Sequence, residues 1–307
     1  MTAPAAPALS TNALRFAHVS DLHLPFEPQL DWGQRWSKRQ LSAWSWRRRR
    51  AVQRPEILDA LRADLAALHP GQLLVTGDVT NFSLPGEFAR AAQWLGALAA
   101  HMNVNVVPGN HDALVPVPEA EGLGRWQQFM EGGQQTPWIA RRNGVAFIGL
   151  TSALPTAPLL ATGRLGAAQL ERLESLLAEE ERSGRLRVVL LHHPLVDGAV
   201  SVRKALSDRA ALRDVLKRAG AELVLHGHAR WARLESVPGP RAPIPVLCVP
   251  SSSALPNRHD EAARWHLVTL PAPGEARWAQ VEVRQWSPGK AAFVSASTYD
   301  LRLPDAG

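Results

Sequence analysis

Acidic, imidazole and amide side chains recur in short clusters along this sequence, and each cluster follows a run of apolar residues. The clusters are Ser20-Asp21-Leu22-His23, Thr76-Gly77-Asp78, Gly109-Asn110-His111-Asp112, His192-His193-Pro194 and His226-Gly227-His228. Carboxylate, imidazole and amide oxygen are ligand types that suit Mn²⁺, Fe²⁺ and Zn²⁺. The clusters therefore predict a site for divalent cations that uses no thiolate.

Any one of these residues carries little weight alone, because an Asp at a strand end most often caps a turn and a single His most often has a structural role. The clusters are informative together, since each follows an apolar run. Other histidines do not fit this pattern, and we predict structural or surface roles for His18, His69, His101, His259 and His266.

The order of the clusters resembles that of the calcineurin-like metallophosphoesterase superfamily, and the resemblance spans residues 15 to about 253. It implies a centre of two divalent cations, Mn²⁺ or Fe²⁺ with Zn²⁺ as an alternative. It also implies the metal ligands, which are Asp21 and His23 for the first ion, Asp78 between the ions, and Asn110, His192 and His228 for the second. In the family the ligand stands two residues before the proline, which favours His192 over His193.

The resemblance further implies hydrolysis of a phosphoester by an activated water, because two cations about 3.5 to 4 Å apart can bind phosphate and stabilise in-line displacement. His111 matches the family histidine that protonates the leaving oxygen. We expect Asp112 to hold the ring of His111, and Asn81 and Arg230 to contact the substrate.

Arg230 marks a departure from the family, whose last motif is Gly-His-x-His where this chain has Gly227-His228-Ala229-Arg230. A permanent cation then replaces one ligand of the first metal, so metal affinity there should fall. Arg230 would either point outward or turn inward to bind substrate phosphate, and both readings stay open. A shift of His226 into the vacant position is disfavoured, because relatives with both later histidines also have a histidine before the glycine.

The segment 31–54 is unlike the rest of the chain and is predicted to be an insertion. It combines tryptophans with dense positive charge, in Trp32, Trp36, Leu41 and Trp44 near one helical face and in Arg35, Lys38, Arg39 and Arg47 to Arg50. Such a helix would suit an anionic membrane interface. It would equally suit packing over the core. Nucleic-acid binding is disfavoured, since no known nucleic-acid module accompanies the patch.

This segment favours an amphiphilic substrate, with a lipid-linked or nucleotide phosphodiester or pyrophosphate as the substrate class and a cyclic nucleotide as the alternative. Fold and metal cluster alone do not select among phosphoesters. The competing reading from another class is a non-catalytic or weakly active binding module on the same fold. Ser251 to Ser253 follow a strand near the site, and for them a turn is favoured over contact with the substrate.

The elements that must position these residues follow from periodicity. Buried strands are expected at 14–19, 72–75, 104–107, 145–150, 187–191, 222–225, 245–249, 265–270 and 279–283. Amphipathic helices are expected at 57–68, 87–100, 167–183 and 208–219. This alternation predicts an α/β fold. The family resemblance refines it to a four-layer αββα sandwich of two mixed sheets flanked by helices.

Length alone allows one large domain or two small ones, and the composition is that of a globular protein. The chain has 307 residues with 46% hydrophobic and 20% charged residues, and its formal charge of +6 favours anionic partners in general. The single Cys248 excludes an intramolecular disulfide. We expect an N-terminal tail over 1–14 without secretory features, the phosphoesterase domain over 15–290 and a C-terminal tail over 291–307. The expected location is cytoplasmic, with peripheral attachment to the inner membrane surface through 31–54.

Overall fold

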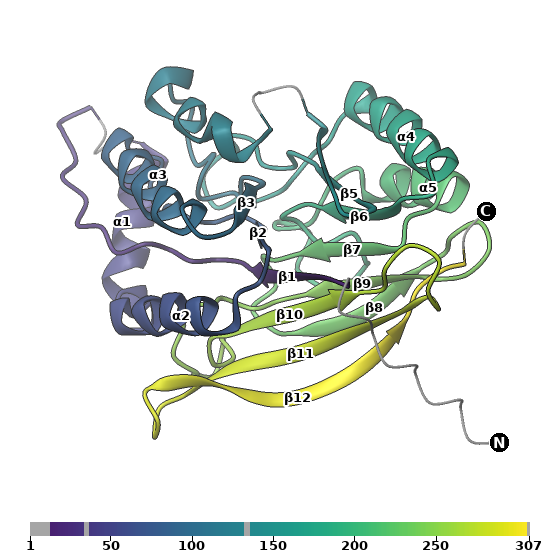
Figure 1. Ribbon diagram of the computed structural model, residues 1–307. Coiled ribbons are helices and arrows are strands. Elements are labelled where there is room, and N and C mark those ends of the chain that lie inside the picture. Colours follow the sequence, from purple (N-terminus) through teal and green to yellow (C-terminus); the bar gives the residue numbers. More distant parts are fainter. Residues whose placement is uncertain (1–12, 34–36, 132–135, 306–307) are drawn as a thin grey trace.

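Two six-stranded mixed sheets lie face to face in the computed structural model, with helices on their outer sides (Figure 1). The structure describes residues 13–33, 37–131 and 136–305. The predicted four-layer αββα sandwich is confirmed. None of the helices in these ranges is long and apolar enough to cross a bilayer.

The first sheet has the strand order β12-β11-β10-β1-β2-β3. Its strands are β1 (Leu14–Val19), β2 (Gln72–Val75), β3 (Asn103–Val106), β10 (Arg264–Leu270), β11 (Trp278–Ser287) and β12 (Ala292–Arg302). Strands β1 to β3 run parallel, and β10 to β12 are antiparallel. Helix α2 (Pro55–Leu68) packs against β12, and α3 (Pro85–Ala99) packs against β3.

The second sheet has the order β4-β5-β6-β7-β9-β8. Its strands are β4 (Trp138–Arg142), β5 (Val145–Gly149), β6 (Leu186–Leu190), β7 (Leu223–His226), β8 (Arg233–Val237) and β9 (Ile244–Cys248). Helices α4 (Ala167–Arg182) and α5 (Arg209–Ala219) pack against it. Two short 3₁₀ helices, Glu119–Glu121 and Leu123–Phe129, lie between β3 and β4.

The core between the sheets is made by the inward side chains of both. Phe16 of β1 meets Phe147 of β5 edge to face, with ring centroids 5.7 Å apart. A second core joins the outer face of β5, β6 and β7 to α4 and α5 through residues such as Leu173 and Leu212. Each such side chain contributes about 1.5 to 3 kcal/mol on burial. These cores hold the ends of β1, β2, β3, β6 and β7 in fixed relative positions.

Three strands were not predicted, namely β4, β8 and β12. The prediction of a C-terminal tail is wrong for residues 292–302, which form β12 and pair with β11 along its whole length. Most side chains of β12 are exposed, with Phe293 and Leu301 buried, so the strand has almost no apolar signal in the sequence. Pairing with β11, which buries apolar side chains at alternate positions, stabilises it instead.

The segment 31–54 contains helix α1 (Lys38–Arg49), which begins at the cap residue Ser37. Its inner face packs on the loop after β2, where Ser42 donates to the Asn81 carbonyl at 2.9 Å and Trp46 meets Phe82 edge to face. The packing reading of this helix therefore holds for one face. Arg35 and Trp36 lie outside the described residues.

Candidate metal centre

The polar clusters that follow β1, β2, β3 and β7 meet in one pocket of about 110 Å³. Its lining includes Asp21, His23, Asp78, Asn110, His111 and His228. Parallel strands present their carboxyl ends at one edge of a sheet, and here the edges of two sheets adjoin. His192, at the end of β6, is fully buried beside this pocket and lies 3.5 Å from Asp78 through Nε2.

The backbone at four of these residues has a left-handed conformation, with φ of 50° at Asp21, 44° at His23, 54° at Asp78 and 64° at His228. This conformation costs a residue with a Cβ roughly 1 to 2 kcal/mol. Hydrogen bonds between the loops hold it in place, since the Asp21 amide donates to the Gly77 carbonyl and the His23 amide to the Asp78 carbonyl, both at 2.9 Å.

The glycines of the motifs allow the loops to approach closely. Gly109 lies so near Asp78 that an added Cβ would overlap the carboxylate, and a Cβ on Gly227 would overlap the Ser20 hydroxyl. These glycines are therefore required by contact distance rather than by turn type. They let the ligand loops of both sheets reach a common point.

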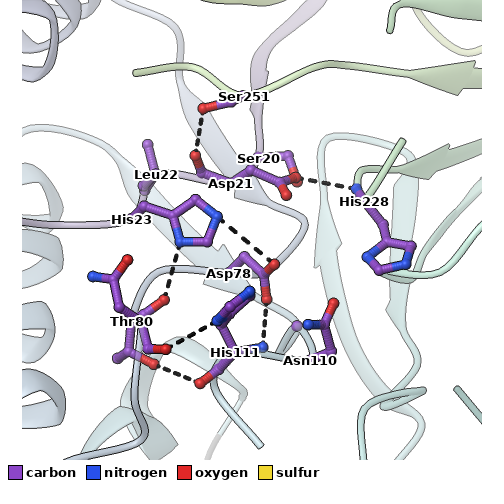
Figure 2. Close-up of polar contacts among 12 residues, drawn as sticks. Ser20, Asp21, Leu22, His23, Asp78, Thr80, Asn110, His111, His228 and Ser251 are labelled. Carbon is purple, nitrogen blue, oxygen red and sulfur yellow. Dashed lines mark hydrogen bonds and ion pairs between the residues drawn. The ribbon is translucent and has the colours of Figure 1, made fainter. Parts of the chain in front are cut away.

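Asp78 lies at the centre of the site, as Figure 2 shows. Its Oδ1 accepts a hydrogen bond from the His111 amide at 2.7 Å, and its Oδ2 is 3.5 Å from His192 Nε2 and 3.9 Å from His23 Nε2. Burial acts to raise the pKa of Asp78, but the facing His192, His111 and His23 hold it well below its usual range. The carboxylate is thus held charged.

The histidines are oriented by backbone carbonyls. His192 Nδ1 is 2.6 Å from the Thr76 carbonyl, His23 Nδ1 is 3.3 Å from that of Thr80, and His228 Nε2 is 3.0 Å from that of Lys204. In each ring the other nitrogen faces the centre. Metal-binding histidines in proteins are commonly fixed in this way, because the carbonyl selects the tautomer whose lone pair points to the ion.

Lone pairs converge at the inner side of His192. Its Nε2 lies 3.2 Å from Asn110 Oδ1 and 3.2 Å from His228 Nδ1, and Asp78 Oδ2 is also close. Burial acts to lower the pKa of His192, yet Asp78 and Asp21 raise it to about 9. The surroundings therefore favour positive charge at this point, which a divalent cation would supply.

The described residues contain two groups of three possible metal ligands. Within each group the ligand atoms lie within 4.8 Å of one another, and Asp78 belongs to both groups. One joins Asp78 to His23 and His111, and the other joins it to His192 and His228. The second set, with Asn110, corresponds to the predicted second ion. The donor types, the shared carboxylate and the carbonyl-anchored rings fit a pair of divalent cations.

A profile of calcineurin-like phosphoesterases matches residues 14–229, which include every predicted metal ligand. The chain belongs to the calcineurin-like phosphoesterase family. Among solved structures, a dimetal phosphatase from Danio rerio matches with a TM-score of 0.60 and 11% identity, covering 95% of this chain and 99% of that one. At this identity the likeness shows the fold. Calcineurin-like phosphoesterases typically bind a dinuclear metal centre, and the two ligand groups described above provide for one.

Two other solved structures align with lower scores. Vacuolar Protein Sorting 29 from Cryptosporidium parvum has a TM-score of 0.47 at 12% identity, covering 94% of this chain and 98% of that one. An NAD nucleotidase from Haemophilus influenzae has a TM-score of 0.47 at 11% identity, covering 93% of this chain and 54% of that one. No curated protein sequence matches the chain.

Asp21 was predicted to hold the first ion with His23. It lines the pocket, but its Oδ2 accepts from the Ser20 hydroxyl at 2.7 Å and from the His228 amide at 3.1 Å, and it is in neither ligand group. Burial is the main cause that raises the pKa of Asp21 to about 6. Its role as a ligand of the first ion stays a prediction.

His111, predicted to be catalytic, stands beside His23 with ring centroids 5.0 Å apart. Its Nδ1 is 2.9 Å from the Asn81 carbonyl. When Nδ1 carries the hydrogen and donates it to this carbonyl, Nε2 is the nitrogen left for the reaction. The backbone of Asn81 therefore orients the ring.

The predicted roles of Asp112 and of the Asn81 side chain need correction. The carboxylate of Asp112 accepts hydrogen bonds from the amides of Val79, Thr80 and Gly109 and from the Thr80 hydroxyl, so it joins the loops after β2 and β3. The side chain of Asn81 is fully buried and donates to the Leu24 carbonyl at 2.9 Å, so it does not reach a substrate. Both residues support the loops beneath the site.

Arg230 lines the pocket at its rim, where its Nε lies 3.4 Å from Asp260 Oδ1. Its side chain is half exposed and lies outside the ligand groups, so the outward reading and the inward, substrate-binding reading both stay predictions. His226 is fully buried and its Nδ1 is 2.9 Å from the Gly227 carbonyl. Because His226 neither lines the pocket nor belongs to either ligand group, the structure gives no support to the idea that it fills the vacant position.

Sequence reasoning missed several residues of this pocket. Gln53 and Lys204 line it and were not singled out. Ser251, for which a turn was favoured over substrate contact, also lines the pocket and donates to the Asp21 carbonyl at 2.7 Å. Gln53 comes from the end of the segment 31–54. Gln53 reaches the pocket because its backbone forms a β-bridge with Ala254, and such a contact leaves no pattern in the sequence.

Proposed function

We propose that this chain is a metal-dependent phosphoesterase that hydrolyses a phosphodiester or pyrophosphate bond. The observation that supports this most directly is the sharing of Asp78 by two ligand groups in one pocket. Bound there, two divalent cations would supply Lewis-acid activation of water and neutralise charge on the phosphorus. His23 and Asp78 would hold the first ion, and Asp78, Asn110, His192 and His228 the second, with Mn²⁺ or Fe²⁺ as the proposed metals.

The chain itself supplies orientation and a proton. Asp78, held charged, fixes the loop of His111 through the amide hydrogen bond at 2.7 Å. His111, with Nδ1 anchored on the Asn81 carbonyl, presents Nε2 to the pocket and would give its proton to the leaving oxygen. Lys204 and Arg230 at the rim would bind the anionic ends of a substrate.

The substrate class we propose is amphiphilic, a lipid-linked or nucleotide phosphodiester or pyrophosphate, with a cyclic nucleotide as the alternative. The exposed tryptophans of the segment 31–54 support the lipid-linked member of this set. The cationic rim suits any of them, because it recognises phosphate rather than the group attached to it.

One feature favours a second candidate, a binding module with little or no catalysis. Arg230 stands where the family has a histidine ligand of the first metal, and Asp21 lies outside both ligand groups. A first site with few ligands would bind its ion weakly. Such a protein would retain the fold and the second metal without turnover.

Reconstitution with Mn²⁺ separates the two candidates. Metal content per chain is measured together with hydrolysis of bis-p-nitrophenyl phosphate, for the unaltered protein, for Asp78→Asn and for His111→Ala. His101→Ala is the matched control, because His101 is exposed at the start of β3, far from the carboxyl ends of the strands. Turnover lost in the two site variants and kept in the control supports the enzyme. Absence of turnover with Mn²⁺, Fe²⁺ or Zn²⁺ in correctly folded protein would reject it.

A further inference from the structure

Large apolar side chains are exposed at few positions of the described chain, and most of these lie on adjacent segments beside the metal pocket. They are Trp32, Leu41, Trp44, Leu159, Val202, Trp231 and Leu234. Single exposed apolar residues need no explanation, whereas a group of them on adjacent segments does. We define the apolar rim as Leu41, Trp44, Leu159, Val202 and Trp231.

Hydrogen bonds connect the segments of this rim to one another and to the metal pocket. The Ala161 amide donates to the Arg203 carbonyl at 2.9 Å, which joins the turns that carry Leu159 and Val202. Ala161, Lys204 and Arg230 line the pocket, and Trp231 directly follows Arg230. The turns and Trp231 therefore surround the mouth of the pocket on one side.

Helix α1 joins the same rim. The Lys38 ammonium donates to the Thr156 hydroxyl at 2.6 Å and to the Leu160 carbonyl at 2.7 Å, on either side of Leu159. Leu41 stands one helical turn beyond Lys38 and Trp44 one turn beyond Leu41, on the same side of the helix. The exposed face of α1 thus continues the apolar rim away from the mouth.

Leu159 destabilises the folded state through its backbone conformation, and its side chain does not pack in the core. It occupies the third position of the turn from Ala157 to Leu160, after Pro158, with φ of 67°. Glycine or asparagine is favoured in this left-handed position, and a leucine there is strained. Its side chain is also 77% exposed. Folding alone would select against both properties, so a role outside the fold explains them better.

Val202 repeats the pattern in the neighbouring turn. The Lys204 amide donates to the Ser201 carbonyl at 2.8 Å, which puts Val202 at the tip, 81% exposed. Cations accompany the apolar tips, since Arg203, Lys204 and Arg230 are all exposed on the same segments. Asp260, beside Arg230 at 3.4 Å, offsets part of this charge.

From this combination we propose that the mouth of the metal pocket docks on an anionic bilayer surface. Leu159 and Val202 enter the outer acyl region, Trp231, Leu41 and Trp44 lie at headgroup depth, and the cations contact acidic headgroups. Docking depends on the rim and not on hydrolysis. That the pocket then receives a phosphoester presented by the membrane rests on the proposed function.

Sedimentation with vesicles tests the proposal on the metal-loaded full chain. The vesicles are phosphatidylcholine with about one third phosphatidylglycerol, or phosphatidylcholine alone, with equal metal in every sample. The central variant is Leu159→Asn with Val202→Asn, because asparagine suits the turns and removes the apolar side chains without loss of folding. Leu234→Asn is the matched control, since Leu234 is exposed in a different pocket formed with residues 301–305.

We expect the unaltered protein to prefer anionic vesicles and the double variant to bind them at least about tenfold more weakly. Arg203→Glu should lose about tenfold, while Arg182→Glu at the opposite end of the second sheet should stay within about twofold. Asp78→Asn should bind vesicles like the unaltered protein, so loss of hydrolysis and loss of docking are distinguishable. No binding to anionic vesicles, equal binding to both vesicle types, or equal binding of the double variant and Leu234→Asn overturns the proposal.

Discussion

The backbone amide of His111 donates a 2.7 Å hydrogen bond to Oδ1 of Asp78, so the carboxylate shared by both ligand groups also fixes the loop of the predicted proton donor. A change at Asp78 therefore acts on metal binding and on the position of His111 together. The effects expected of substitutions at Asp78 and at His111 on metal content and on turnover follow from this coupling.

Asp78→Asn should lower turnover about a thousandfold and reduce bound metal, because an amide cannot bridge two cations as a carboxylate does. The measurement is metal content per chain alongside hydrolysis of an aryl phosphodiester. His111→Ala should instead keep the metal while losing most of the turnover, since its proton transfer is lost. Equal metal loss in both variants would contradict the separate roles given to them.

Arg230→His should raise affinity for the weaker metal about tenfold, because an imidazole then stands where the family has a ligand. The Mn²⁺ concentration for half-maximal turnover measures this, and the substitution also removes the ion pair with Asp260. Arg230→Gln controls for the loss of charge and should leave the metal requirement unchanged. A large fall in turnover for both variants would show that the contribution of Arg230 to substrate binding outweighs any gain in metal affinity.

Glu87→Ala should destabilise the protein by about 3 kcal/mol. The carboxylate of Glu87 accepts hydrogen bonds from the amides of Asn81, Phe82 and Leu84 at 2.7, 2.9 and 3.1 Å, and its loss leaves these buried donors unsatisfied. Denaturant unfolding measures the change. Glu171→Ala, at an exposed position of α4, is the control and should change stability by less than about 0.5 kcal/mol.

His266 should make the folded state sensitive to acid. Burial, with a smaller effect of Arg264, lowers its pKa from 6.5 to about 3, so the unfolded chain binds a proton that the folded chain refuses between these pH values. Its stabilising effect is complete above pH 6.5 and declines as the pH falls towards 3, by about 1.4 kcal/mol per pH unit. In His266→Phe the free energy of unfolding should decline less over this range. Parallel pH profiles of the two proteins would contradict this.

The strands next to the site could be predicted from the sequence because they are buried on both faces and read as apolar runs. The site residues could be predicted because ligand-type side chains follow those runs. The carbonyls of Thr76, Thr80 and Lys204 that orient the histidines could not, since every residue has a carbonyl and only the fold selects which one meets a ring. The role predicted for Asp112, to hold the ring of His111, failed for a related reason. The two residues are adjacent in sequence, but the carboxylate binds backbone amides and the Thr80 hydroxyl instead.

The edge strands escaped prediction for a different reason. In β12 most side chains face solvent, so its place in the sheet depends on backbone pairing with β11, which leaves no hydrophobic pattern. The tryptophans of the segment 31–54 suggested a membrane-facing helix or a helix packed over the core, but of Trp32, Trp36 and Trp44 only Trp44 lies in α1, and the membrane reading stays a prediction. The turns of Leu159 and Val202 were not foreseen, because two isolated apolar residues in loops acquire meaning only when the fold brings them together.

The left-handed backbone at Asp21, His23, Asp78 and His228 lowers the stability of the folded state at the positions that carry the site's side chains. Glycine or asparagine at each position would relieve roughly 1 kcal/mol and would remove a charged or imidazole side chain in the same step. Selection for thermal tolerance alone would therefore erode this pocket early, while the sheets around it stayed intact. In the absence of metal, variants that keep the fold and lose these side chains should therefore unfold at a higher temperature than the unaltered protein.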